Sequence, residues 1–191
     1  MHNRLVIGVI GVIGWMLSGC TFNFPLFPGP GPLQETQVDG TGKAKVLLIE
    51  ISGVISSQEK EGLRSAPSMI ASVKEQLTRA AKDENVKALV LRINTPGGTV
   101  TASDIIYHEL KTFKATRKVP IIASIMDVGT SGGYYIAAAA DTVMAHPSSV
   151  TGSIGVIMLT MNARGLLEKV GVEATAVTSG PSKDMGSPFR I

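Results

Sequence analysis

Ser131 is the residue whose setting most directly predicts covalent chemistry. It lies in GTSGG, residues 129–133, between an apolar run at 119–126 that is typical of a strand and an alanine-rich run that is typical of a helix. A serine at such a corner exposes its Oγ atom and has the N–H of Gly132 beside it, which resembles, without completing, the nucleophile elbow of α/β-hydrolases. The alternative is a serine that caps the amino end of a helix. Ser131 is therefore a candidate nucleophile.

A second glycine-rich corner, NTPGGT at residues 94–99, follows another apolar run. Adjacent glycines at the end of a strand can turn backbone N–H groups toward an incoming oxygen, because no Cβ atom obstructs the approach. The N–H of Gly132, together with one from Gly97 or Gly98, would stabilise an oxyanion by roughly 3 to 4 kcal/mol per donor. The alternative for this stretch alone is a tight turn.

A serine nucleophile needs a base, and three residues are candidates. His108 falls within a predicted helix and is expected to be structural, whereas His146 precedes a proline at a strand end and is the better histidine. Lys183 lies in the polar stretch TSGPSKDMGSPF. A free lysine has a pKa near ~10.4, so burial would have to lower that pKa by about 3 units to make a base at neutral pH. The alternative is a surface lysine paired with Asp184.

Apolar and amphipathic runs alternate along the chain and predict an α/β fold. The predicted strands span residues 45–55, 86–94, 119–127, 142–147, 153–160 and 173–180, and the predicted helices span 65–85, 101–118, 132–141 and 162–171. Strands that alternate with helices form a largely parallel, buried sheet with crossover helices. Reactive groups in such a sheet gather at the carboxyl ends of the strands, where both glycine-rich corners fall.

The first twenty residues are predicted to be a leader and not part of the fold. Arg4 precedes an apolar run at residues 5–17, which is shorter than the roughly 20 residues of a spanning helix and suits a signal-peptide core of about 7 to 15 residues. The end of this segment, Leu-Ser-Gly-Cys20, resembles the bacterial lipobox, so we expect Cys20 to be lipidated. An uncleaved amino-terminal anchor is the alternative. Either way, the body is expected outside the cytoplasm and near a membrane.

Residues 21–42 are rich in proline and glycine and predict a tether, and residues 43–191 are long enough for one folded domain with a core. The chain is 44% hydrophobic and 17% charged, as is typical of a globular protein. Its net charge of +3 is scattered along the chain without interleaved aromatic residues, so no nucleic-acid partner is expected. A single cysteine excludes an intrachain disulfide and a cysteine-based zinc site.

Four stretches together resemble one known family. INTPGGTVTAS, DVGTSGGYYIAAAAD, PSSVTGSIGV and TSGPSKDMGSPF occur in the order found in bacterial signal peptide peptidase A, and they fall within residues 45–191. The resemblance implies a ClpP/crotonase-like α/β fold and serine-peptidase activity with a Ser-Lys dyad. It implies neither a metal nor a nucleotide cofactor.

The resemblance also implies the role of each matching residue. Ser131 corresponds to the nucleophile, Lys183 to the general base, and Ser153 to the hydroxyl that orients the lysine amine. Gly97, Gly98 and Gly132 correspond to the oxyanion-binding positions. Family substrates are cleaved signal peptides left in the membrane, and family members form homo-oligomeric rings with active sites assembled between neighbouring chains. The expected function is thus that of a membrane-tethered serine endopeptidase that degrades cleaved signal peptides.

Three features depart from the family pattern. Thr95 stands where serine is usual before Pro-Gly-Gly, the lipobox is not the usual anchor, and the chain stops at Ile191, sooner than family proteins do. The last feature predicts a chain that lacks the carboxyl-terminal part of the peptidase domain. Two other functions stay open: a crotonase-like acyl-CoA hydrolase or hydratase, and a non-catalytic, truncated assembly module. Lys183 and the leader argue against the crotonase, which needs neither.

Overall fold

The computed structural model describes residues 33–59 and 66–190. The predicted leader, Cys20 and the first part of the predicted tether lie outside these described residues. The chain divides into two compact units, one that ends at Gly152 and one that begins at Ser153.

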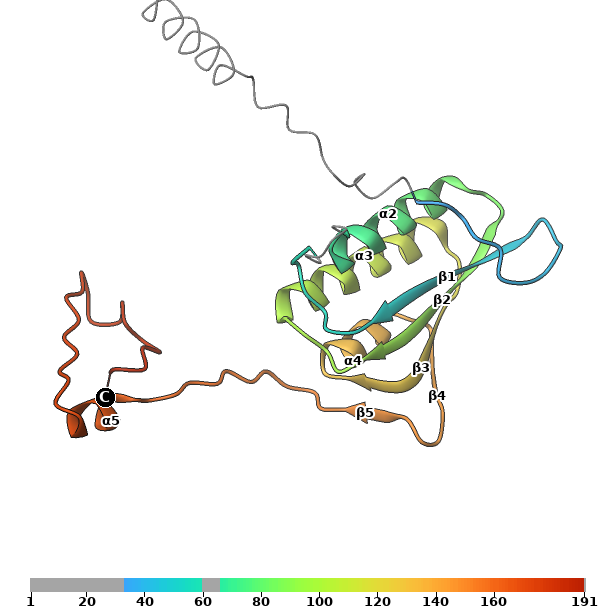
Figure 1. Ribbon diagram of the computed structural model, residues 1–191. Helices are drawn as coiled ribbons and strands as arrows, with labels where there is room; N and C mark the ends of the chain where they lie inside the picture. The colour runs from blue at the N-terminus through green and yellow to red at the C-terminus, as the bar shows by residue number, and fades with distance from the viewer. Residues whose placement is uncertain (1–32, 60–65, 191) are drawn as a thin grey trace, which may run out of the picture. The chain divides into compact units, whose positions relative to one another are not determined.

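Up to residue 145 the first unit alternates strands and helices in the predicted order, and it ends with a short strand at 150–152 that was not predicted (Figure 1). Its strands are β1 (Lys45–Ser52), β2 (Val86–Thr95), β3 (Ile121–Thr130), β4 (Thr142–Ala145) and β5 (Val150–Gly152), and its helices are α2 (Met69–Lys82), α3 (Val100–Arg117) and α4 (Gly132–Ala137). The strands form one sheet in the order β1-β2-β3-β4. Every pairing in it is parallel, so the predicted α/β class with a largely parallel sheet is confirmed.

Strand β3 has two successive partners along the edge that faces away from β2. Its first half pairs with β4 over Ile122–Ile125, and its second half pairs with β5 over Val128–Thr130. The chain turns between these two partners at residues 146–149, where the N–H of Ser149 donates to the carbonyl of His146 at 2.9 Å. The carboxyl end of β3 is therefore flanked by strands on both sides, and this end leads into the Ser131 corner.

The core lies between the sheet and helices α2 and α3, which lie side by side over one face (Figure 1). Alternate side chains of β1, β2 and β3 are buried there: Ile49, Ile51, Leu89, Leu91, Ile93, Ile121, Ala123 and Ile125. On the opposite face, Glu50 pairs with Arg92 at 2.8 Å, and Val46 is 62% exposed. The prediction of a buried sheet therefore holds only for the face toward the helices, because both crossover helices lie on that face.

Polar side chains fix the ends of the two long helices. The hydroxyl groups of Ser68 and Thr99 accept hydrogen bonds from backbone N–H groups in the first turns of α2 and α3, which satisfies donors that have no partner within the helix. Arg117, in the last turn of α3, donates to the carbonyl of Ala80 at 3.1 Å and to that of Asp83 at 3.0 Å. These bonds join the carboxyl ends of α2 and α3.

Helix α4 is shorter than the predicted helix at residues 132–141, because the chain returns to the sheet at Asp141. The N–H of Asp141 donates to the carbonyl of Ile121 at 2.8 Å, and the Asp141 carboxylate accepts from the N–H of Ile121 at 2.8 Å. The same carboxylate pairs with Lys114 of α3 at 2.6 Å. Asp141 thus anchors the beginning of β3, the strand that leads to Ser131.

The second unit contains one helix, α5 (Arg164–Lys169), among its described residues, and this helix falls within the predicted range of 162–171. The strands predicted at 153–160 and 173–180 are wrong, since the structure assigns no strand to either stretch. A strand needs a partner for its backbone N–H and C=O groups, and neither stretch pairs with a strand in the described part of the chain. The apolar residues that suggested the first strand, such as Ile157 and Leu159, are exposed.

We expect Asp141→Asn to destabilise the first unit at neutral pH and to have less effect in acid. The hydrogen bond from the N–H of Ile121, followed by the pair with Lys114, lowers the pKa of Asp141 below its ordinary value. A lowered carboxyl pKa stabilises the fold above the pKa of the unfolded chain, and this stabilisation is lost as the pH falls through the folded pKa. Urea unfolding of both proteins at pH 7 and across the range below about pH 4 measures the difference.

The exposed Glu75 of α2 offers a matched control, and Glu75→Gln should leave the unfolding midpoint unchanged at pH 7. The role assigned to this carboxylate would be contradicted if wild type and Asp141→Asn differed in free energy of unfolding by the same amount at neutral and at strongly acid pH.

Candidate active site

Ser131 occupies the corner between β3 and α4 with an unusual backbone. Its φ is 51° and its ψ is −121°, a region that residues with a side chain rarely adopt. Its N–H donates to the carbonyl of Gly152 at 2.8 Å, and its carbonyl accepts from the N–H of Tyr135 at 3.0 Å. The Ser131 side chain makes no capping hydrogen bond to α4, so the helix-cap alternative does not describe this residue. The hydroxyl of Ser131 is half-buried and does not serve as a helix cap.

Gly97 lies directly against Ser131, although 34 positions separate them in the sequence. A Cβ atom placed on Gly97 would lie 2.8 Å from the Cβ of Ser131 and 3.1 Å from its Oγ, and Gly97 has a φ of +103°. Contact this close and this backbone conformation both require glycine. The two glycine-rich corners predicted from the sequence are therefore brought together at the carboxyl ends of β2 and β3.

The backbone groups of Gly97 are already bound within the fold. Its N–H donates to the Thr95 hydroxyl at 3.0 Å, and its carbonyl accepts from the N–H of Ile55 at 2.9 Å. The N–H of Thr99 donates to the carbonyl of Ile55 at 2.9 Å, which completes a parallel bridge between Ile55 and Gly98. Of the two open possibilities for this turn, Gly98 and not Gly97 therefore has the N–H suited to an outside acceptor.

The direction of the Gly98 N–H follows from this bridge. Ile55 makes both hydrogen bonds of this bridge, with the residues on either side of Gly98. In parallel geometry, the N–H and C=O of Gly98 itself then point to the side away from Ile55. Ile55 continues β1, and Gly98 continues β2, so the N–H of Gly98 points toward the edge where β3 and Ser131 lie. The N–H of Gly132, the first residue of α4, is one of the donors that a helix leaves without an internal partner. Two N–H groups can thus serve an oxygen bound at Ser131.

Three residues support this corner in roles that sequence reasoning did not assign to them. Thr95 is fully buried and holds the Gly97 turn, and buried Ser103 lies beneath Gly132, where a Cβ would come within 2.2 Å of its Oγ. The side-chain carbonyl of Asn94 accepts from the N–H of Val128 at 3.2 Å, which ties β2 to β3. In the sequence, only their position near the glycine-rich motif indicates such roles, because the residues that they contact are distant in the sequence.

Ser153 and Lys183, predicted to orient and to supply the base, belong to the second unit. Ser153 has a φ of 51°, and Lys183 is exposed. Asp184 pairs with Arg190 at 3.0 Å. Its partner is therefore not Lys183, which was considered as an alternative. The contact between Lys183 and Ser131 stays a prediction.

Both histidines among the described residues have local partners. His146 Nδ1 lies 2.7 Å from the Ser148 hydroxyl, and His108 Nδ1 lies 3.3 Å from the Asp104 carboxylate. His108 is on the exposed side of α3 and bonds within its own helix, in line with a structural role. Within residues 33–59 and 66–190, no group of three or more His, Cys, Asp or Glu side chains could hold a metal ion. Nor does any helix in this part of the chain have the length and apolar character needed to cross a membrane.

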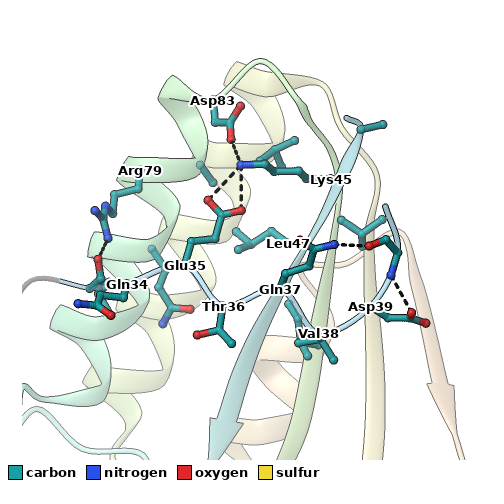
Figure 2. A pocket seen from close by; sticks show the side chains of 18 of the residues that line it. Gln34, Glu35, Thr36, Gln37, Val38, Asp39, Lys45, Leu47, Arg79 and Asp83 are labelled. Atoms are coloured by element: carbon teal, nitrogen blue, oxygen red, sulfur yellow. Dashed lines mark hydrogen bonds and ion pairs between the residues drawn. The ribbon is translucent and has the colours of Figure 1, made fainter. Parts of the chain in front are cut away.

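A cavity of about 770 Å³ lies at the other end of the sheet (Figure 2). It is lined by residues 33–40 with parts of β1 and α2, and Lys45 bridges Glu35 and Asp83 at its rim, each at 2.9 Å. The hydrogen bonds to Glu35 and then to Asp83 raise the pKa of Lys45, and the bond from Lys45 lowers the pKa of Asp83. Lys45 begins β1, whereas Ser131 follows the end of β3, so this cavity and the candidate active site are separate.

The comparisons with known proteins point to one family. The model of peptidase family S49 matches residues 113–191. A putative signal peptide peptidase SppA of Enterococcus faecium is 36% identical over 156 residues, which are 81% of this chain and 45% of that protein. Protease 4 of Haemophilus influenzae is 33% identical over 135 residues, which are 71% of this chain and 21% of that protein. Together these matches support assignment of the chain to peptidase family S49.

The chain spans less than half the length of these two relatives. Among solved structures, a 1510-N membrane-bound stomatin-specific protease matches 64% of this chain and 53% of its own at 22% identity, with a TM-score of 0.49. A likeness this weak supports no inference about activity.

We expect Gly97→Ala to abolish the reactivity of Ser131 while most of the sheet still folds. The new Cβ would lie 2.8 Å from the Cβ of Ser131 on a backbone with positive φ, so either the turn or the serine must move. Labelling by a fluorophosphonate, which reacts with activated serines, should fall by at least about 10-fold, since the oxyanion donors move with the turn.

The matched control is Gly42→Ala, because a Cβ at Gly42 meets nothing within 4 Å. Wild-type labelling in Gly97→Ala would refute the close contact between the two corners.

Proposed function

We propose that this chain carries the catalytic centre of a serine endopeptidase in which Ser131 is the nucleophile and Lys183 the general base. The observation that carries the proposal is the strained backbone of Ser131 beside the Gly97–Gly98 turn. The positive φ of Ser131 is energetically unfavourable, and its side chain makes no capping hydrogen bond that would explain it. Backbone strain of this kind is concentrated at functional sites. The match of residues 113–191 to the model of a peptidase family supports the same assignment.

The proposed reaction begins when Lys183 Nζ accepts the hydroxyl proton of Ser131. The Oγ atom attacks the carbonyl carbon of the scissile peptide bond, and the carbonyl oxygen takes up negative charge. The N–H groups of Gly98 and Gly132 stabilise this oxyanion. When the intermediate collapses, the C–N bond breaks, and the amine leaves with the proton returned by Lys183. Water then attacks the acyl-enzyme, with Lys183 again as the base, and releases the acid product.

Lysine can act as this base only if its amine is neutral near pH 7. Because a free lysine has a pKa near ~10.4, its surroundings must lower that pKa by about 3 units through desolvation. Lys183 is exposed in the second unit, so we propose that it becomes buried when it meets Ser131 with substrate in place. Ser153, which shares the second unit with Lys183, would then orient the amine through its hydroxyl.

We further propose that the substrates are cleaved signal peptides. The name of the Enterococcus faecium relative refers to such peptides, and a peptidase held at a membrane meets them where they remain after secretion. Association of several copies into a ring is part of this proposal. It is supported by the exposed apolar side chains of the second unit, which lie along residues 154–161 and would favour burial against another surface.

The dyad is tested by fluorophosphonate labelling and peptide hydrolysis in the full-length protein. Ser131→Ala should abolish both. Lys183→Met keeps an unbranched side chain one atom shorter and removes the amine, so the rate should fall by roughly 100- to 10,000-fold, as expected for the loss of a general base. His146→Ala is the control and should retain wild-type activity.

Activity that survives in Lys183→Met and disappears in His146→Ala would replace lysine by histidine as the base. A protein that hydrolyses CoA thioesters but no peptides would instead support the crotonase-like alternative, which shares the oxyanion geometry.

Membrane attachment through Cys20 is a separate proposal, supported by the short apolar run that precedes this residue. Mass spectrometry of the purified amino terminus should find a diacylglyceryl group on Cys20, and Cys20→Ala should move the protein from the membrane fraction to the soluble fraction. Ser18→Ala, two positions away, should leave the protein in the membrane fraction. An intact leader in the mature protein would contradict lipidation and favour an uncleaved anchor.

A further inference from the structure

Thr95 ends β2 and is fully buried where three segments of the chain meet. Its hydroxyl oxygen accepts a hydrogen bond from the N–H of Gly97 at 3.0 Å, and its hydroxyl proton is donated to the carbonyl of Gly53, just past β1. Its methyl group faces α4, because a Cβ placed on Gly133 would lie 2.5 Å from Cγ2 of Thr95. One side chain therefore contacts the end of β1, the glycine turn and the helix that follows Ser131.

The bond from Thr95 determines the orientation of the peptide groups in the turn. With its N–H bound to Thr95 and its carbonyl bound to Ile55, Gly97 is held on both sides. The N–H of Gly98 then has one direction, toward Ser131 and away from Ile55. Without the hydroxyl, the buried N–H of Gly97 would have no partner, which is an unfavourable state for a buried donor. Rotation of the turn would relieve this cost and would turn the Gly98 N–H away at the same time.

We propose that Thr95 is a positioning residue of the peptidase reaction: its hydroxyl holds the Gly97–Gly98 turn so that the N–H of Gly98 points at the developing oxyanion. The proposal rests on the function proposed above and extends it to a residue that acts through Gly98. An oxyanion donor interacts most strongly in the transition state, so a misdirected donor lowers kcat and leaves substrate binding largely intact. The methyl group, by contrast, fills space against Gly133.

Two variants of the full-length protein separate the hydroxyl from the methyl group. Thr95→Val keeps the shape and removes the hydroxyl, whereas Thr95→Ser keeps the hydroxyl and removes the methyl group. On a fluorogenic peptide substrate, Thr95→Val should lower kcat by roughly 10- to 100-fold, somewhat less than complete removal of a donor, with KM within about threefold of wild type. Thr95→Ser should keep kcat within about threefold of wild type, because the hydroxyl bond to Gly97 remains.

A pair of inhibitors distinguishes positioning from a merely structural role. A peptide aldehyde forms a tetrahedral adduct with an oxyanion, so its Ki should rise in Thr95→Val by the same factor by which kcat falls. The matching peptide alcohol forms no oxyanion, and its Ki should not change. A structural defect would lower the fraction of folded protein, measured by thermal unfolding, without this difference between the two inhibitors.

The outcomes separate this proposal from the one on which it rests. A wild-type protein that neither hydrolyses peptides nor reacts with a fluorophosphonate would refute the peptidase function and the role of Thr95 with it. An active wild type with an equally active Thr95→Val, or with equal losses in the Val and Ser variants, would refute the role of Thr95 alone. If Thr95→Val does not fold, Thr95→Cys takes its place, since a thiol is a weaker hydrogen-bonding group; a kcat equal to that of Thr95→Ser would then overturn the proposal.

Discussion

The positive φ of Ser131 is the constraint on which the site depends. For a residue with a Cβ atom, this backbone region costs of order 1 to 3 kcal/mol, so neighbouring groups must hold it. The hydrogen bond to Gly152 fixes the N–H of Ser131, and the bond from Tyr135 fixes its carbonyl. Gly97, which has no side chain, leaves room for the serine that results. The hydroxyl is thus directed by backbone contacts on two sides.

The parallel sheet supplies these neighbours. Because β2 and β3 run in the same direction and are adjacent, the turn after β2 and the corner after β3 lie at the same edge. Helix α3 separates the two in the sequence and is the crossover that makes their adjacency possible. One edge of β3 is shared between β4 and β5. Because β5 pairs with the last residues of β3, it brings the Gly152 carbonyl to the N–H of Ser131.

Much of the first unit could be predicted from the sequence, because hydrophobic periodicity and glycine are local signals. The order of strands and helices and the two glycine-rich corners follow from such signals. The choice between Gly97 and Gly98 could not be made, because it depends on the Thr95 hydroxyl, whose other partner, Gly53, is 42 positions away. The strand predicted at 153–160 was wrong for a related reason: an apolar run indicates burial but does not say which surface provides it. The proposed contact between Ser131 and Lys183 would also depend on residues that are distant in the sequence.

The hydrogen bond between Ser131 and Gly152 has a mechanical consequence. Gly152 is the last residue of the first unit, and the next peptide bond begins the unit that contains Ser153 and Lys183. A pull on that unit would therefore reach the serine backbone through one covalent link and one hydrogen bond of 2.8 Å. If the pull drew Gly152 away, Ser131 would lose a contact that offsets its strain and would relax toward an ordinary backbone. The backbone geometry of Ser131 would in this sense respond to tension along the chain.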